Sequence, residues 1–136
     1  MAKNYLINEG NQIGYMDASF DANLNLVNKK LVAGANITKG QVVYVSGDMT
    51  VSPTTAASKA VIGVAMFDAK SGDPIAVECE GLMKLTASAA ITAGSQVESA
   101  AGGKVATVGG TVTKVIGIAL SAASKDGDDV IVKFSI

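Results

Sequence analysis

Apolar and polar residues alternate over several short stretches of this chain, which is the pattern of a β-strand with one face in the core. In residues 75–80, Ile75, Val77 and Cys79 share one face, and two glutamates lie on the other. Residues 130–136 alternate in the same way. Both stretches therefore predict half-buried strands, and the inward face of the first would hold the only cysteine as a small core residue.

Two other stretches are apolar almost throughout. They read VIGVAM at residues 61–66 and VIGIAL at residues 115–120, each with a glycine near its centre. A continuous apolar run suits a strand that is buried on both faces, and a glycine within it suits a close approach by another backbone. We therefore predict that Gly63 and Gly117 are packing glycines.

The second half of the chain repeats the first. Residues 30–71 align with residues 84–125 at a constant offset of 54, and one inserted residue then shifts the offset to 55 up to the C-terminus. Similarity of this length without a gap indicates a duplicated module. The predicted organisation is an N-terminal segment at 1–28 and a duplicated β-domain at 29–136, with repeat 1 at about 30–81 and repeat 2 at about 84–136.

One phrase is nearly identical in the two repeats. It reads ANITKGQVV at residues 35–43 and AAITAGSQV at residues 89–97. In each copy an isoleucine can be buried, a threonine can bond to the local backbone, and a glycine supplies a conformation that is costly for other residues. Gly40 and Gly94 are therefore predicted to be turn glycines, and the phrase is a feature of the architecture rather than of catalysis.

The segment that precedes the repeats has a different composition. Residues 1–28 contain six asparagines interspersed with isolated large apolar residues and show no clean period. Apolar side chains in a polar terminal segment need burial, either over the protein's own core or against a partner. In the second interpretation the segment is an extended arm, and its candidate partner-binding residues are Tyr5, Ile7, Ile13, Tyr15, Met16 and Phe20.

Composition and charge disfavour several classes of partner. The 136-residue chain has a formal net charge of −1, and all eleven of its cationic side chains are lysines. A near-neutral protein without arginine lacks both the positive electrostatic potential and the planar guanidinium groups that nucleic-acid binding commonly uses. No segment has the pattern of a secretion signal or a membrane span, so synthesis in a cytoplasm is expected.

Few residues of the chain are candidates for catalysis or metal binding. The chain has no histidine and one cysteine, so a Cys/His zinc site or a histidine-based catalytic pair is not available. Glu78 and Glu80 share the predicted solvent face of a strand, and they fit that role better than a catalytic pair. The sequence therefore predicts no enzyme activity, no cofactor and no small-molecule substrate.

Two short motifs have a second interpretation. The acidic turn at 126–129 reads DGDD and fits a β-turn, with calcium binding left open as an alternative. The Met-Lys pair at Met83 and Lys84 also occurs in biotin and lipoyl carrier domains, but the residues around it differ from that motif. A carrier function is accordingly disfavoured.

The motifs taken together resemble a known family. The order of an apolar strand, A-x-I-T-x-G-x-x-V, a Gly-rich turn, V-I-G-[VI]-A-x-x-x-A, a Gly-Asp turn and an alternating strand, present twice over residues 29–136, is similar to that of phage capsid cement or decoration proteins. The resemblance implies a non-enzymatic virion protein that binds the outer surface of a mature capsid and stabilises it. It also implies the major capsid protein as partner and, commonly, a homotrimer. The alternative is an adhesion module or a β-module associated with a tail or fibre.

The fold expected from these patterns is all-β. It is a compact sandwich or barrel built from two similar duplicated halves, with an extended N-terminal arm.

Overall fold

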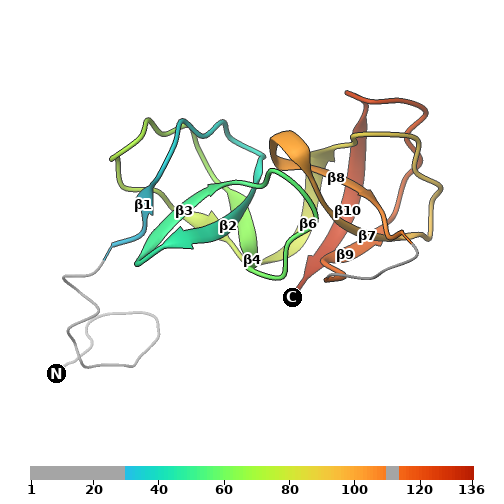
Figure 1. Cartoon of the computed structure of the whole chain (residues 1–136). Coiled ribbons are helices and arrows are strands. Elements are labelled where there is room, and N and C mark those ends of the chain that lie inside the picture. Colours follow the sequence, from blue (N-terminus) through green and yellow to red (C-terminus); the bar gives the residue numbers. More distant parts are fainter. Residues whose placement is uncertain (1–29, 110–113) are drawn as a thin grey trace, which may run out of the picture. The chain divides into compact units, whose positions relative to one another are not determined.

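The fold consists of two β-sheets that follow one another along the chain (Figure 1). The computed structural model describes residues 30–109 and 114–136, and Leu31–Ile136 forms one compact unit. Within the described ranges the helical structure is one short 3₁₀ turn, η2 (Ala101–Gly103), and no helix is long and apolar enough to span a bilayer. The predicted all-β class is confirmed.

The first sheet is built from strands within residues 32–78. Its strands are β1 (Val32–Ala33), β2 (Val42–Gly47), β3 (Thr50–Pro53), β4 (Val61–Ala65) and β5 (Val77–Glu78), in the spatial order β1-β3-β2-β4-β5. The short β1 pairs with β3 in parallel, whereas the other neighbours are antiparallel.

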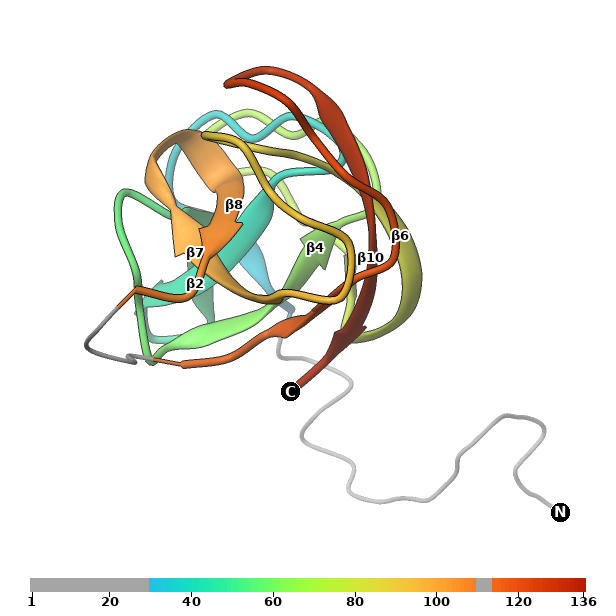
Figure 2. The ribbon, with the colours of Figure 1, turned by 90° about the vertical axis from the view of Figure 1, so that its right-hand side faces the viewer.

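The second sheet is built from strands within residues 80–135 and has longer pairings. Its strands are β6 (Glu80–Thr86), β7 (Gln96–Ala100), β8 (Lys104–Thr107), β9 (Gly117–Ala119) and β10 (Asp129–Ser135), in the order β6-β10-β9-β7-β8. β10 and β6 run alongside each other in Figure 2 and pair over seven residues, from Asp129 opposite Thr86 to Ser135 opposite Glu80. On β10 the alternation holds, because Val130, Val132 and Phe134 are fully buried, but Ile136, which the pattern over 130–136 also placed inward, lies beyond the strand and is 50% exposed.

Backbone hydrogen bonds in the two sheets occupy equivalent positions. The Gly40 amide donates to the Ala65 carbonyl at 3.0 Å, and the Gly94 amide donates to the Ala119 carbonyl at 2.7 Å. Both glycines lie in the left-handed region, with φ of 90° and 92°. A side chain is strained in that conformation, so the turn that opens β2 and the turn that opens β7 both require glycine.

The two central glycines lie where strands approach closely. A Cβ atom at Gly63 would overlap the carbonyl oxygen of Glu78, and one at Gly117 would overlap the carbonyl oxygen of Lys133. Backbone on the neighbouring strand thus occupies the space that a side chain would need.

The core has two parts, and the second depends on both repeats. One cluster of buried residues lies within the first repeat and includes Val43 and Val51. The other contains the buried residues of the second repeat together with Val42, Val61 and Val64 of the first. The second repeat therefore packs on one side of the first sheet and completes its core with residues of β2 and β4.

Polar contacts reinforce this junction. The buried hydroxyl of Thr54 donates to the Ala100 carbonyl at 2.8 Å, and the Gly103 amide donates to the Thr54 carbonyl at 3.0 Å. The buried Ser99 hydroxyl accepts from the Ser58 amide and donates to the Ala56 carbonyl. The buried hydroxyls of Thr54 and Ser99 are thus both paired, as buried polar groups in a stable contact usually are.

Two details of the predicted strands are wrong. Cys79 is exposed rather than buried, because β5 ends at Glu78 and the chain passes into the second sheet at Glu80. The apolar runs at 61–66 and 115–120 are not covered on both faces along their whole length. Their outward residues Met66, Ile118 and Leu120 are 46%, 43% and 51% exposed, because no second layer of the described chain covers those positions.

Candidate functional site

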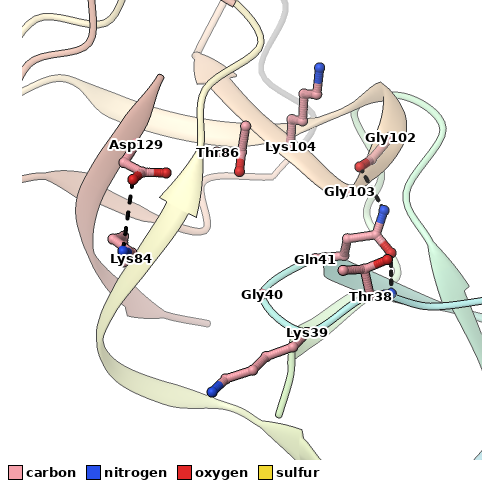
Figure 3. Close-up of a pocket in the computed structure, with 10 residues that line it drawn as sticks. All are labelled: Thr38, Lys39, Gly40, Gln41, Lys84, Thr86, Gly102, Gly103, Lys104 and Asp129. Carbon is pink, nitrogen blue, oxygen red and sulfur yellow. Dashed lines mark hydrogen bonds and ion pairs between the residues drawn. The ribbon is translucent and has the colours of Figure 1, made fainter. Parts of the chain in front are cut away.

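A hollow of about 380 Å³ lies where the two modules meet (Figure 3). One wall is the turn before β2, and the other is formed by β6, η2 and the first residues of β8 and β10. Its lining residues are Thr38, Lys39, Gly40, Gln41, Lys84, Thr86, Gly102, Gly103, Lys104 and Asp129.

The side chain of Gln41 makes two hydrogen bonds at the edge of this hollow. Its side-chain oxygen accepts from the Thr38 amide at 2.7 Å, and its side-chain nitrogen donates to the Gly102 carbonyl at 3.0 Å. Gly103 lies against the same side chain, and a Cβ there would be 2.6 Å from the Cβ of Gln41. The bond to Gly102 joins the two modules and the bond with Thr38 holds the turn, so this amide serves the junction rather than a ligand.

The three lysines of the hollow do not converge. The Lys104 ammonium is 2.8 Å from Asp126, and the Lys84 ammonium is 3.8 Å from Asp129. In Figure 3 the Lys39 and Lys104 side chains point in different directions. Exposed pairs of this kind contribute little to stability, and their arrangement does not surround one anionic group.

The three aspartates at the turn before β10 also have separate partners. Asp126 and Asp129 pair with the two lysines named above, whereas Asp128 accepts from the Ser124 hydroxyl at 2.8 Å and from the Ser124 and Lys125 amides. These hydrogen bonds, the Ser124 hydroxyl first, lower the pKa of the Asp128 carboxyl. Over the part of the chain that the structure describes, no group of three or more Cys, Asp or Glu side chains is placed to hold a metal ion.

The remaining sequence motifs occupy structural positions. Lys84 lies within β6 opposite Ile131 and not at a hairpin tip, which disagrees with the geometry of a carrier domain. Glu78 and Glu80 are both exposed. The six candidate residues of the N-terminal arm, Tyr5, Ile7, Ile13, Tyr15, Met16 and Phe20, lie outside the described residues.

An exposed apolar surface is the main feature that sequence reasoning missed. Leu82 on β6, Ile118 on β9 and Ile131 on β10 point outward, with exposures of 69%, 43% and 36%. Leu120 lies beside Ile131 through a backbone hydrogen bond of 2.7 Å. We call the outward residues Leu82, Ile118, Leu120, Ile131 and Lys133 the second-sheet face. The alternation of β10 contained the signal, because a strand with Val130 and Val132 inward must place Ile131 outward.

The comparison with protein families identifies the chain. A family model described as phage cement protein matches residues 21–134. The chain belongs to the phage cement protein family. It is therefore a phage structural protein, and the resemblance that the repeated motifs carried is confirmed.

The fold of this cement protein also occurs in a phage head fiber. The crystal structure of the head fiber gp8.5 N base of bacteriophage phi29 is similar to it, with a TM-score of 0.60 and 22% sequence identity, over 78% of this chain and 91% of that chain. At this identity the likeness concerns the fold alone. No curated protein matches the chain.

Cement proteins are virion components, and the contacts of such a protein with other proteins are made at its surface. The exposed surfaces of this family member are therefore better candidates for its functional site than the hollows. The hollow at the module junction is lined by residues that hold the modules together, such as Gln41, which bonds to Gly102. The second-sheet face, in contrast, leaves large apolar side chains without a partner among the described residues. Apolar residues gathered on one face are typical of a protein–protein contact.

Proposed function

We propose that this protein binds the outer surface of a mature phage capsid through the major capsid protein and stabilises the shell. The observation that carries the proposal is the family match over residues 21–134. The two sheets with their shared core support it, because a rigid β-body is suited to bridging shell subunits. The protein acts without catalysis, cofactor or small-molecule substrate, and it does not bind nucleic acid or membrane.

Stabilisation follows from preferential binding to the mature shell. A protein that binds the expanded capsid and not its disrupted form shifts the equilibrium toward the intact capsid by mass action. Several weak contacts made together by one oligomer give a high overall affinity without a large single interface. We propose that the oligomer is a homotrimer, which would match threefold positions of a shell.

The two parts of the chain have separate roles in this proposal. Residues 1–28 are the arm that contacts the capsid or a neighbouring subunit, through the apolar residues named above. Residues 29–136 are the duplicated body, which Gly40, Gly94, Gly63 and Gly117 shape at turns and close strand contacts. Synthesis in the host cytoplasm would precede addition of the protein to the capsid surface.

Co-sedimentation with capsids tests the function. Purified protein is mixed with expanded capsids that lack their own decoration protein, and unexpanded procapsids of the same phage are the control. Saturable binding to expanded capsids alone is expected, and the number of copies bound per capsid identifies the kind of symmetry position. Absence of binding to a matched expanded capsid would contradict the proposal and favour a tail-associated or adhesion module.

Deletion of residues 1–28 tests the role of the arm in the same assay. Loss of binding is expected while the circular dichroism spectrum of the body is retained. Undiminished binding of the deletion variant to expanded capsids would contradict a role of the arm in capsid contact, without contradicting capsid binding by the body.

A further inference from the structure

β5 is an edge strand, although its equivalent in the second sheet is covered on both sides. With the offset of 55, β10 is equivalent to residues 74–80, which contain β5. β10 pairs with β9 on one side and with β6 on the other, whereas β5 pairs within the described residues with β4 alone. The first sheet therefore has an open edge where the second sheet has β6.

Burial declines along this open edge. The inward residues of β10, which lies beside β6, are fully buried and are Val130, Val132 and Phe134. Their equivalents in the first repeat are Ile75, Val77 and Cys79. Ile75 is buried, Val77 is half-buried and Cys79 is exposed. Because a neighbouring strand covers the side chains beside it, this decline indicates a covering strand beside Ile75 and no covering strand of the described chain beside Cys79.

The first described residues of the body already make the contacts of β6. The Ile75 amide donates to the Leu31 carbonyl at 3.1 Å, and Val32 forms an antiparallel bridge with Pro74. The equivalent pairs of the second sheet join β10 to β6 and are Val130 with Leu85 and Asp129 with Thr86. The register of β6 against β10 is thus present in the first sheet up to Leu31.

The contacts one residue further along the chain agree with this register. The Ala33 amide donates to the Asp73 carbonyl, and the Ala87 amide donates to the Asp128 carbonyl, each at 2.8 Å. Ala33 and Ala87 are equivalent at the offset of 54, and the two aspartates are equivalent at the offset of 55. The alignment of the two repeats therefore holds at successive positions where the chain enters each sheet.

The sequence before Leu31 can form the missing strand. The offset of 54 makes residues 26–31 equivalent to residues 80–85 of β6, and they read LVNKKL. Val27 would take an inward position, and Lys29 would take that of Met83, which is half-buried. A lysine can pack its methylene groups at such a position and keep its ammonium group in solvent.

We propose that residues 26–31 form a strand at the open edge of the first sheet, antiparallel to β5 and in the register that β6 has against β10. The family match supports this occupant, because it covers residues 21–134 and so includes the proposed strand. The strand also pairs backbone groups at an edge that would otherwise be available to other chains.

This strand defines where the arm begins. The part of the chain available for the proposed capsid contact becomes residues 1–25, which still contain all six candidate contact residues. A strand paired along its length would anchor this arm to the body through a row of backbone hydrogen bonds. The strand does not depend on capsid binding, so its failure would leave the co-sedimentation test unaffected.

The only cysteine makes the register testable in the full chain. Ile75 and Leu31 are hydrogen-bonded, so Val27 and Cys79, four residues along each strand, would form a pair of the same kind. The Cα atoms of such a pair are about 5.5 Å apart, which permits a disulfide. After mild oxidation, mass spectrometry of Val27→Cys without reduction should show an intramolecular disulfide to Cys79 in most molecules.

Asn28→Cys is the matched control for this experiment. Its side chain would point to the other face of the proposed strand, so it should form at least tenfold less of the disulfide. Equal yields in the two variants, or no disulfide in either, would overturn the proposal. A disulfide that links two chains would place the strand of one copy on another copy and would also overturn it.

Hydrogen exchange provides a second measurement without any substitution. The Cys79 amide should exchange at least tenfold faster in a chain that lacks residues 1–28 than in the full chain, because the deletion removes its proposed partner at Val27. Deletion of residues 1–25 keeps the proposed strand and should leave this amide protected. The Ala119 amide of the second sheet shows that each variant is folded. Equal exchange of the Cys79 amide in all three chains would contradict the strand.

Discussion

Asp128 organises the turn that leads into β10. Its carboxylate accepts from the hydroxyl and the amide of Ser124 and from the amide of Lys125. The equivalent turn of the first repeat is simpler, because Asp73 accepts from the Lys70 amide at 3.1 Å. Bonding to the charged form explains why the pKa of the Asp128 carboxyl is lowered.

This lowered pKa gives the turn a defined dependence on pH. Since the pKa in the folded protein lies below the ordinary value of 3.8, the carboxylate stabilises the fold fully above that value, and this contribution is lost as the pH falls through the folded pKa. Asp128→Asn should therefore lower the melting temperature at neutral pH, and the difference from wild type should shrink below pH 3.8.

Thermal unfolding from neutral to acidic pH measures this difference, and an NMR titration of the Asp128 carboxyl locates its midpoint. Ser124→Ala is the control, because it removes the largest cause of the shift and should move the midpoint upward. A gap between wild type and Asp128→Asn that stays constant into the acid range would contradict the assignment.

At the level of elements, the contact between β9 and β10 depends on the absence of a side chain at Gly117. A Cβ there would meet the Lys133 carbonyl oxygen and, at 2.8 Å, the Cγ1 of Val132. Because the nearer atom belongs to the backbone of a paired strand, the strands must separate to accept it. The equivalent contact in the first sheet is that of Gly63 with β5.

Gly117→Ala should destabilise the protein by about 1–3 kcal/mol, the usual cost of overpacking. The free energy of unfolding in urea measures the effect. Gly47→Ala is the matched control, because its Cβ would lie 3.5 Å from the Cβ of Thr50, an ordinary contact, and its unfolding free energy should change little or rise. Equal stability of Gly117→Ala and wild type would contradict the close approach.

The elements also show what the sequence can and cannot predict. Alternation on β10 predicted the burial of Val130, Val132 and Phe134, since a paired strand with one covered face obeys a period of two. The same rule failed at Cys79, because a local pattern contains no information on where the chain leaves one sheet for the next. The exposure of Ile118 could not be predicted either, since it depends on which face of a sheet receives the other module.

For the candidate site the sequence supplied the family and the non-catalytic interpretation, but not the surfaces. The family follows from motif order, which is local along the chain. The second-sheet face depends on side chains from three strands, with Leu82 and Ile118 on either side of Lys133. Such neighbours are set by strand order, and a crossed order like β6-β10-β9-β7-β8 is not encoded in any single stretch.

In the whole molecule, the larger of the two core clusters joins the modules, because it contains buried residues of both. Val42 is fully buried on β2 of the first sheet and packs among the core residues of the second module. Ala65 and Ala119 are buried at equivalent positions, and their amides donate to the carbonyls of Gln41 and Ser95, each at 2.9 Å. These two amides therefore report separately on the opening of the first and second modules.

The core cluster that joins the modules predicts that they unfold together. Native-state hydrogen exchange should give the Ala65 and Ala119 amides the same free energy of opening, equal to that of global unfolding. Val42→Ala should lower both values equally, by about 2 kcal/mol, because its cavity lies between the modules. If this substitution reduced protection at Ala65 alone, the first module would be opening independently. A cement protein whose two halves open as one unit keeps its surfaces in place, as the proposed bridging of shell subunits would require.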